Sequence, residues 1–208
     1  LERLLRASSR TPARGLAMGF SATAMVQSSS AVLVAIVSFV SAGFMSLTQV
    51  VWVVYGANVG TTTTAWIVAI LGVKTDITIL VLPLMVLGLF LWLSGLKGKR
   101  PALGEVLAGF AVFFYGVEFL QFAFEGMDHL PMNLYLQSGI TGLAIFIGIG
   151  FFLTVATQSS SAAIAFILAA TAGGVVPMHL AAAAVIGANL GTTTTAILAT
   201  INASPASR

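Results

Sequence analysis

The pentapeptide QSSSA occurs twice in the chain, at residues 27–31 and at residues 158–162. A second phrase follows each copy, as GANVGTTTTA at residues 56–65 and as GANLGTTTTA at residues 187–196. Both pairs share one offset, from position 27 to 158 and from 56 to 187, so the chain contains a duplicated unit rather than two accidental matches. In membrane proteins built from two repeats, paired polar interruptions of the apolar segments indicate where a solute binds.

The composition is that of an integral membrane protein. Charged residues are 7% of the 208 positions and apolar residues 58%, with a mean hydropathy of +1.04. The charges lie in short breaks between apolar runs, so we expect one membrane transport domain over residues 1–208. The bases form no stripe interleaved with aromatic residues, which argues against a nucleic-acid partner. The chain has no cysteine, which excludes disulfides and thiolate metal sites.

The lengths of the apolar segments predict two kinds of helix. A straight crossing needs about 20 apolar residues. Residues 77–96 are uncharged and residues 104–124 are nearly so, and we expect each to cross the bilayer. The segments beside the repeated motifs are only about half as long as a crossing; they are residues 15–26, 31–43, 46–55 and 61–72. Such half-length helices predict a re-entrant hairpin with QSSS at its tip, followed by a helix broken at each GAN turn.

The predicted fold is an all-α integral membrane protein with two inverted-topology repeats, re-entrant hairpins and broken helices. The hairpin returns to its own side, which leaves an odd number of crossings per repeat and so inverts the second copy. Repeat one covers residues 1–125 and lacks its first helix. Repeat two covers residues 104–208, takes residues 104–125 as its first helix and lacks its last, so we expect truncation at both ends. Residues 140–157 are either a hairpin arm or a full crossing.

The distribution of the basic residues agrees with this number of membrane crossings. Eight of the nine bases fall on one predicted side, in the N-terminal segment, the C-terminal tail and the loop that carries Lys97, Lys99 and Arg100. The other side holds only Lys74. Because cytoplasmic loops are enriched in Lys and Arg, we expect a polytopic protein of the plasma membrane with its N-terminus and the Lys97 to Arg100 loop in the cytoplasm.

The serines stand directly before short apolar helices. A helix N-terminus offers free N–H groups and a partial positive charge, so hydroxyls there can form an uncharged site for a phosphate-like oxyanion. The GAN turns are expected to act in the same way for helices that begin at Thr61 and Thr192. The candidate anion-binding residues are Ser28, Ser29, Ser30, Asn58, Ser159, Ser160, Ser161 and Asn189.

Neutralising a multiply charged anion requires a cation from outside the motifs, because no Lys or Arg lies within them. The hydroxyl, amide and carbonyl oxygens of these segments are hard ligands that suit Na+. A sodium ion bound beside the anion would offset its charge and couple the two fluxes.

Alternative interpretations of these residues stay open. Serine and threonine also serve as packing residues in membrane helices, and GAN can be a simple kink, although two copies at one offset favour binding. Glu118, the carboxylate well inside a predicted crossing, is either a coupling residue or a satisfied helix contact, for example with Gln121. The imidazoles of His129 and His179 lie near predicted loops and no acid adjoins the motifs, so we expect no serine nucleophile and no enzyme.

The paired QSSS and GAN-x-GT elements resemble those of the type II sodium/phosphate cotransporter family, over nearly the whole chain. The resemblance implies sodium-driven uptake of inorganic phosphate by alternating access, with phosphate on the QSSS serines. It places the coupling Na+ on oxygens of the same elements, here Gln27, Gly60, Thr61, Thr62, Gln158, Gly191, Thr192 and Thr193. The expected partners are phosphate, sodium ions and the lipid bilayer, and a homodimer and a soluble regulatory domain or partner are left open.

Three other functions fit the same motifs. Helix ends and hydroxyls can bind an oxyanion without distinguishing one oxyanion from another. A sodium-coupled carrier of sulfate or a dicarboxylate is therefore an alternative. A non-transporting membrane scaffold or phosphate sensor would keep the site without moving the solute. An anion channel is a further alternative, although paired hairpins that close on one site favour a carrier.

Overall fold

The computed structural model describes residues 11–73, 78–94, 98–125, 127 and 139–201. Within these ranges all regular structure is helical. Most of the bases on which the predicted membrane orientation depends lie outside the described residues; they are Arg3, Arg6, Arg10, Lys74, Lys97 and Arg208. His129 also lies outside them.

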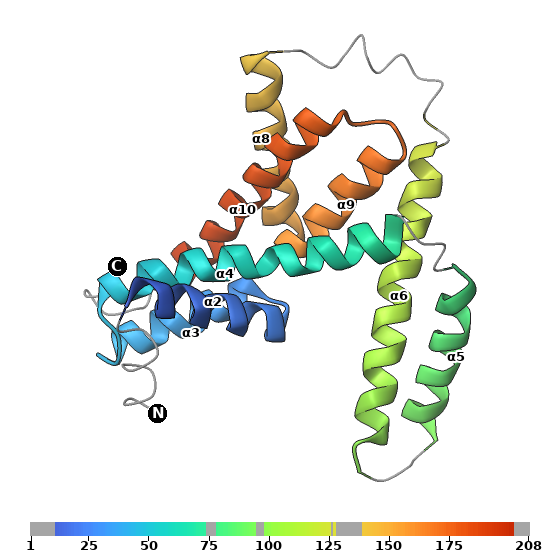
Figure 1. Ribbon diagram of the computed structural model, residues 1–208, viewed down its shortest axis with the longest axis horizontal. Helices are drawn as coiled ribbons and strands as arrows, with labels where there is room; N and C mark the ends of the chain where they lie inside the picture. The colour runs from blue at the N-terminus through green and yellow to red at the C-terminus, as the bar shows by residue number, and fades with distance from the viewer. Residues whose placement is uncertain (1–10, 74–77, 95–97, 126, 128–138, 202–208) are drawn as a thin grey trace. The chain divides into compact units, whose positions relative to one another are not determined.

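The helices agree with an all-α membrane protein (Figure 1). In chain order they are α2 (Pro12–Val26), α3 (Ser29–Ser41), α4 (Leu47–Ile67), the π-helix η1 (Val68–Val73) that continues α4, α5 (Thr78–Leu93), α6 (Arg100–Glu125), α8 (Ile140–Thr157), α9 (Ser160–Ala172) and α10 (Met178–Thr200). Four helices in the described part of the chain are long and apolar enough to cross a bilayer: Leu47–Gly72, Arg100–Glu125, Ile140–Thr157 and Met178–Thr200. The predicted fold class is confirmed at this level, and the inversion of the repeats stays a prediction.

The described helices fall into two compact units. The first contains α2, α3, α4, α8, the start of α9 and α10, and it combines helices from both predicted repeats. The second contains η1, α5, α6 and the remainder of α9. The predicted repeat boundaries, residues 1–125 and 104–208, stay predictions.

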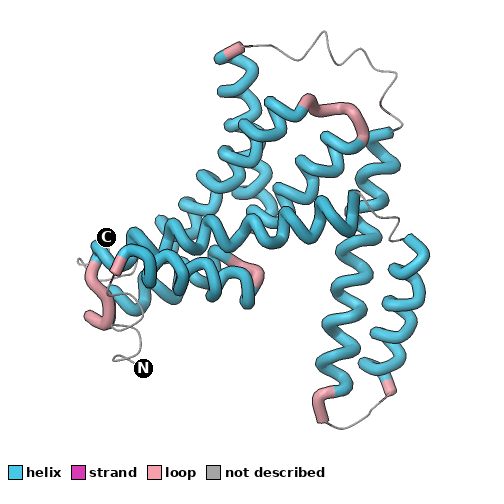
Figure 2. The backbone as a smooth tube through the Cα atoms, in the orientation of Figure 1, coloured by secondary structure: helices cyan, strands magenta, loops and turns pink. Residues whose placement is uncertain are grey.

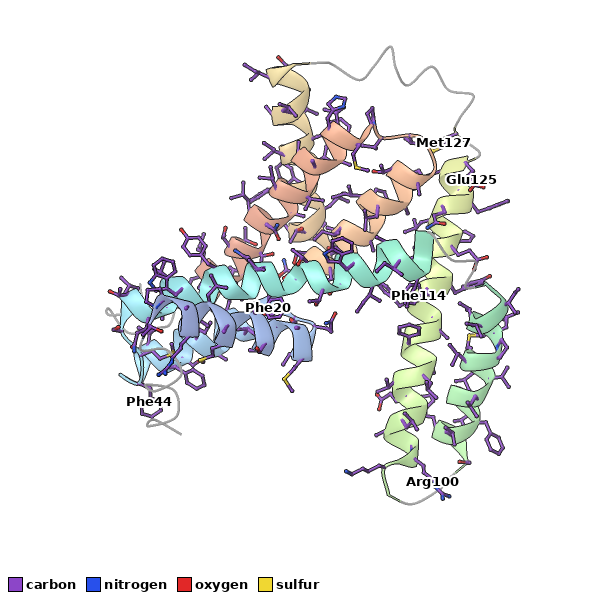
Figure 3. All side chains as sticks on the ribbon, in the orientation of Figure 1. Phe20, Phe44, Arg100, Phe114, Glu125 and Met127 are labelled. Atoms are coloured by element: carbon purple, nitrogen blue, oxygen red, sulfur yellow. The ribbon has the colours of Figure 1, made fainter. Side chains whose placement is uncertain are left out.

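Each unit has an apolar core of its own. In the first unit α3 packs on α4 through a cluster of buried residues: Val32, Ile36, Val40, Met45, Val53 and Ala57. In the second, Phe114 of α6, labelled in Figure 3, is 1% exposed and packs with Val81 and Ala111.

Short helices flank the first QSSS motif, as predicted, and a short helix follows the second. α2 begins at the N-cap Thr11, whose hydroxyl accepts a hydrogen bond from the backbone N–H of Arg14, and it ends before Gln27. α3 and α9, which follow the two motifs, have 13 residues each. Figure 2 shows the helices as cyan tubes and the described loops and turns in pink. A helix–turn–helix arrangement at each motif is confirmed, and its re-entrant path in a membrane stays a prediction.

The prediction of a helix broken at each GAN turn is wrong. α4 runs as one helix through residues 56–60, and α10 does the same through residues 187–191. There is consequently no helix N-terminus at Thr61 or Thr192. The half-length segments predicted on either side of the first turn join into the single apolar helix Leu47–Gly72 of 26 residues.

Close helix packing explains why these glycines do not break the helix. A Cβ atom on Gly56 would collide with the backbone carbonyl oxygen of Leu16 in α2, and one on Gly187 with that of Ile147 in α8. A glycine in a helix costs only about 1 kcal/mol, and small residues let two membrane helices approach closely. The glycines therefore serve α2–α4 and α8–α10 packing rather than a turn.

The two predicted crossings between the repeats differ in length. The segment 104–124 forms α6, a 26-residue helix that is long and apolar enough for the predicted crossing. The segment 77–96 forms α5, which has 16 described residues, and both ends of the predicted segment lie outside the described residues. The segment left open, residues 140–157, is one uninterrupted helix of crossing length.

Candidate functional site

The two QSSS motifs meet at one small polar pocket in the first compact unit. Its wall consists of Gln27, Ser28, Ser29, Ser30, Gln158, Ser159, Ser160 and Ser161. The structure thus brings together two tetrapeptides that belong to different repeats and lie far apart in the sequence. These residues include six of the eight predicted anion ligands and both glutamines predicted to bind sodium.

The pocket is too small for a phosphate-sized anion as it stands. Its volume is about 30 Å³, which is room for one or two water molecules. A tetrahedral oxyanion has five heavy atoms and needs more space. In this arrangement the two motifs therefore leave no room for such an anion between them.

Each motif sets a helix N-terminus at the pocket. The Ser28 hydroxyl oxygen accepts a hydrogen bond of 3.2 Å from the N–H of Ala31 and so caps α3. The Ser159 hydroxyl oxygen does the same for α9, again at 3.2 Å, with Ala162 as donor. The first serine of each motif is therefore committed to capping, while the first-turn N–H groups of each helix have no intrahelical acceptor.

The second serine of each motif is the group best placed to bind a solute. Ser29 and Ser160 are each 5% exposed and line the pocket. The structure records no hydrogen bond for either hydroxyl among the described residues. Both hydroxyls line the pocket without a recorded partner, so they can donate to an entering oxyanion.

Both glutamines have the same unusual backbone. Gln27 has φ 56° and Gln158 has φ 53°, and they are the two non-glycine residues with positive φ in the part of the chain that the structure describes. The left-handed conformation costs roughly 1–3 kcal/mol in such residues and is concentrated at functional sites. It reverses the chain between the helix that ends and the helix that begins.

The side chains of the two glutamines differ. Gln27 donates from Nε2 to the carbonyl oxygen of Ala24 at 2.6 Å and to Thr63 Oγ1 at 3.3 Å, and its Oε1 accepts from Thr64 Oγ1 at 2.6 Å. Gln158 donates from Nε2 to the carbonyl oxygen of Val155 at 2.6 Å, and no hydrogen bond to α10 is recorded within the described ranges. Gln27 is therefore held against α4, whereas the carboxamide oxygen of Gln158 is open.

The threonine contacts show which residues the sequence analysis missed. It selected Thr61 and Thr62 as neighbours of Gln27, but the contacts come from Thr63 and Thr64. These two lie one helical turn beyond Gly60, on the face of α4 that meets α2. The 3.6-residue period applied to Gly56 and Gly60 would have found them, had α4 been predicted as continuous.

The four predicted threonines bond to their own helices. Thr61 and Thr192 are buried, and their hydroxyls donate to the carbonyl oxygens four residues earlier, at 3.2 and 3.4 Å. Thr62 and Thr193 are exposed and donate to the carbonyl oxygens three residues earlier, at 2.7 and 2.6 Å. Their oxygens keep lone pairs, but none of the four lines the pocket.

The remaining predicted site residues lie away from the pocket wall. Asn58 and Asn189 are half-buried within α4 and α10 and do not line it. The carbonyl oxygens of Gly60 and Gly191 each accept a 2.7 Å hydrogen bond from a threonine hydroxyl. An unbroken helix therefore does not release these carbonyls as the predicted turn would have done.

Glu118 lies half-buried on α6 in the second unit. Gln121, considered as its partner, donates from Nε2 to the carbonyl oxygen of Gly72 at 2.7 Å. A coupling role for Glu118 stays a prediction.

Apolar helices of crossing length define a class, that of polytopic helical membrane proteins, and the polar pocket walled by uncharged side chains is the candidate solute site. The Na+/Pi-cotransporter family matches residues 1–122 and 131–207, and the chain belongs to that family. The predicted family is thereby confirmed.

Several relatives support this assignment. The uncharacterized protein YqeW of Bacillus subtilis is 32% identical over 190 residues, which are 86% of this chain and 57% of that protein. YjbB of Salmonella typhimurium, named as a proposed inorganic phosphate export protein, is 29% identical over 191 residues, 91% of this chain and 34% of that protein. The sodium-dependent phosphate transport protein 2A of Oryctolagus cuniculus is 40% identical over 67 residues, 31% of this chain and 10% of that protein. The chain thus spans only part of the length of each of these relatives, and no solved structure matches it.

Proposed function

We propose that this protein carries inorganic phosphate across the plasma membrane together with Na+ by alternating access. The observation that supports the proposal most is the meeting of both QSSS motifs at one small polar pocket. Family membership points to the same solute and the same coupling ion. A transporter family also favours a role without catalysis.

Phosphate is held between the two helix starts. Ser29 and Ser160 donate from their hydroxyls, and the N–H groups of the first turns of α3 and α9 donate from the backbone. Each helix N-terminus contributes about half a positive charge, so two of them offset only part of the charge of the anion. Among the residues that the structure describes, no Lys or Arg lines the pocket to supply the rest.

Sodium supplies the missing positive charge. The open carboxamide oxygen of Gln158 is a hard neutral ligand of the kind that Na+ accepts. Gln27 is engaged with Thr63 and Thr64, so in this arrangement the two motifs contribute unequally. Sodium and phosphate then bind cooperatively, because each reduces the electrostatic cost of the other.

Net export is a second candidate, favoured by the name of YjbB. A coupled carrier is reversible, so the gradients of sodium and phosphate decide the direction. An inward sodium gradient drives uptake, and we take uptake as the function. Efflux from phosphate-loaded proteoliposomes that ignores an opposing sodium gradient would favour export.

Proteoliposome uptake tests the proposal. The full-length protein is expected to accumulate ³²P-phosphate when an inward sodium gradient is imposed, and Ser29→Ala or Ser160→Ala should abolish this accumulation without loss of protein from the membrane. Ser38→Ala is the matched control, since Ser38 lies on α3 and bonds within its own helix at 2.9 Å. Normal uptake by both motif variants would remove these serines from the mechanism.

The same preparation separates the alternatives. Stronger competition by sulfate or succinate than by phosphate would make the protein a carrier of another oxyanion. Phosphate binding without accumulation would make it a sensor or scaffold.

A further inference from the structure

Two buried threonine hydroxyls, one in each repeat, lack a hydrogen-bond partner. They are Thr23 Oγ1 in α2 and Thr154 Oγ1 in α8, on residues that are 1% and 3% exposed. The two residues are separated by the same offset as the two QSSS motifs. A single unsatisfied hydroxyl can be accidental, but recurrence at equivalent positions indicates a shared purpose. An unsatisfied buried atom calls for an explanation, and an ion bound there is one of them.

Both threonines lie in the last turn of the helix that leads into a QSSS motif. The carbonyl oxygen of Thr23 accepts a 2.7 Å hydrogen bond from the N–H of Gln27, which ends α2. A helix C-terminus carries about half a negative charge. Neither α2 nor α8 has a basic residue in its last turn to complement it. The surroundings of both hydroxyls therefore attract a cation.

A glycine of the neighbouring helix packs closely against each threonine. A Cβ atom on Gly60 would lie 2.8 Å from Thr23 Cβ and 2.8 Å from the carbonyl oxygen of Phe20. In the second repeat, a Cβ atom on Gly191 would lie 2.6 Å from Thr154 Cβ and 2.8 Å from the carbonyl oxygen of Phe151. Glycine thus keeps a side chain away from a hydroxyl and a carbonyl oxygen, which are neutral oxygen ligands that Na+ uses.

We propose that Thr23 Oγ1 and Thr154 Oγ1 are ligands of two sodium sites, one behind each serine motif. The inference rests on the proposed function, because it locates the coupling ion. Each cation lies at the C-terminus of the helix before the turn, and the anion lies at the N-terminus of the helix after it. Two equivalent sites also make transport depend cooperatively on sodium, with a Hill coefficient above about 1 and at most about 2.

Replacement of both threonines by valine tests the assignment, because valine has nearly the same shape and no hydroxyl. Thermal unfolding of the full-length protein in detergent is compared in sodium chloride and in choline chloride at equal ionic strength. In choline the Thr23→Val/Thr154→Val variant should melt higher than wild type, by about 2–4 °C or more, because an unsatisfied buried hydroxyl is gone. In sodium the wild type should gain stability and the double variant should not.

Two controls separate this result from a general packing effect. Thr23→Ser/Thr154→Ser keeps both hydroxyls and should keep the sodium-dependent rise in melting temperature. Thr171→Val removes a half-buried hydroxyl that is already bonded to the carbonyl oxygen of Ile167 at 2.7 Å. It should melt lower than wild type in choline and respond to sodium as wild type does.

Each other outcome has a definite meaning. A double valine variant that keeps the wild-type response to sodium, or that melts lower than wild type in choline, overturns the assignment. A wild-type protein with no response to sodium contradicts sodium coupling itself, and the proposed function then fails before this inference is reached.

Discussion

The hydrogen bonds of Gln27 to α4 make a prediction that the second repeat can control. Thr64→Val removes the 2.6 Å hydrogen bond from Thr64 Oγ1 to Gln27 Oε1. A typical hydrogen bond contributes about 0.5–1.5 kcal/mol net. Gln27 is exposed, so water can replace part of the lost bond, and we expect a loss near the lower end, about 0.5–1 kcal/mol.

The equivalent change in the second repeat is Thr195→Val. No hydrogen bond joins Gln158 to this residue in the described part of the chain, so we expect its effect to stay within about 0.5 kcal/mol. Denaturant unfolding of the full-length protein in detergent measures both changes.

A double-mutant cycle gives the decisive comparison. Thr64→Val combined with Gln27→Leu should show a coupling of about 0.5–1 kcal/mol, whereas Thr195→Val combined with Gln158→Leu should show almost none. Equal coupling energies in the two repeats would show that the two glutamines make equivalent hydrogen bonds. Gln158 would then not be the one glutamine of the two with an open carboxamide oxygen.

Two further predictions concern helix packing and capping. Gly56→Ala and Gly187→Ala should each sharply reduce the amount of folded protein, because a Cβ atom there meets a backbone carbonyl group. Gly109→Ala, whose added Cβ atom would have nothing within 4 Å, should be neutral or stabilise the protein by up to about 1 kcal/mol. Detergent-solubilised yield and melting temperature measure these effects, and equal losses at all three positions would contradict the described helix packing. Ser28→Ala and Ser159→Ala should each lower the free energy of unfolding by about 0.5–2 kcal/mol, because each removes a helix cap. Denaturant unfolding measures this loss, and an unchanged free energy of unfolding would mean that these hydroxyls do not cap α3 and α9.

Much of the fold follows from local features of the sequence. The low charge and the length of the apolar runs predict membrane helices, and α6 and α8 lie where those runs do. The serines lie at helix starts because the chain turns at each glutamine, and the offset shared by both repeated phrases predicts that the two turns are alike. Backbone hydrogen bonds within a helix join residues four apart, so such features depend on few neighbours.

The GAN segments show where local reasoning fails. Considered only in their local sequence, glycine and asparagine predict a turn. The resulting prediction of broken helices was wrong. The glycines are needed because α2 and α8 press against them, and that contact joins residues of different helices that are well separated in the sequence. The sequence alone does not say which helix faces a glycine.

By itself the sequence determined the membrane class, the duplicated design and the type of side chain at the site, because composition and repetition need no knowledge of contacts. Only the tertiary structure decided that both serine motifs share one pocket, that Thr63 and Thr64 rather than Thr61 and Thr62 reach Gln27, and that two threonine hydroxyls are buried without partners. Identical sequence motifs in the two repeats make different hydrogen bonds, because the partners of a side chain depend on the helix that packs against it. That helix comes from elsewhere in the chain.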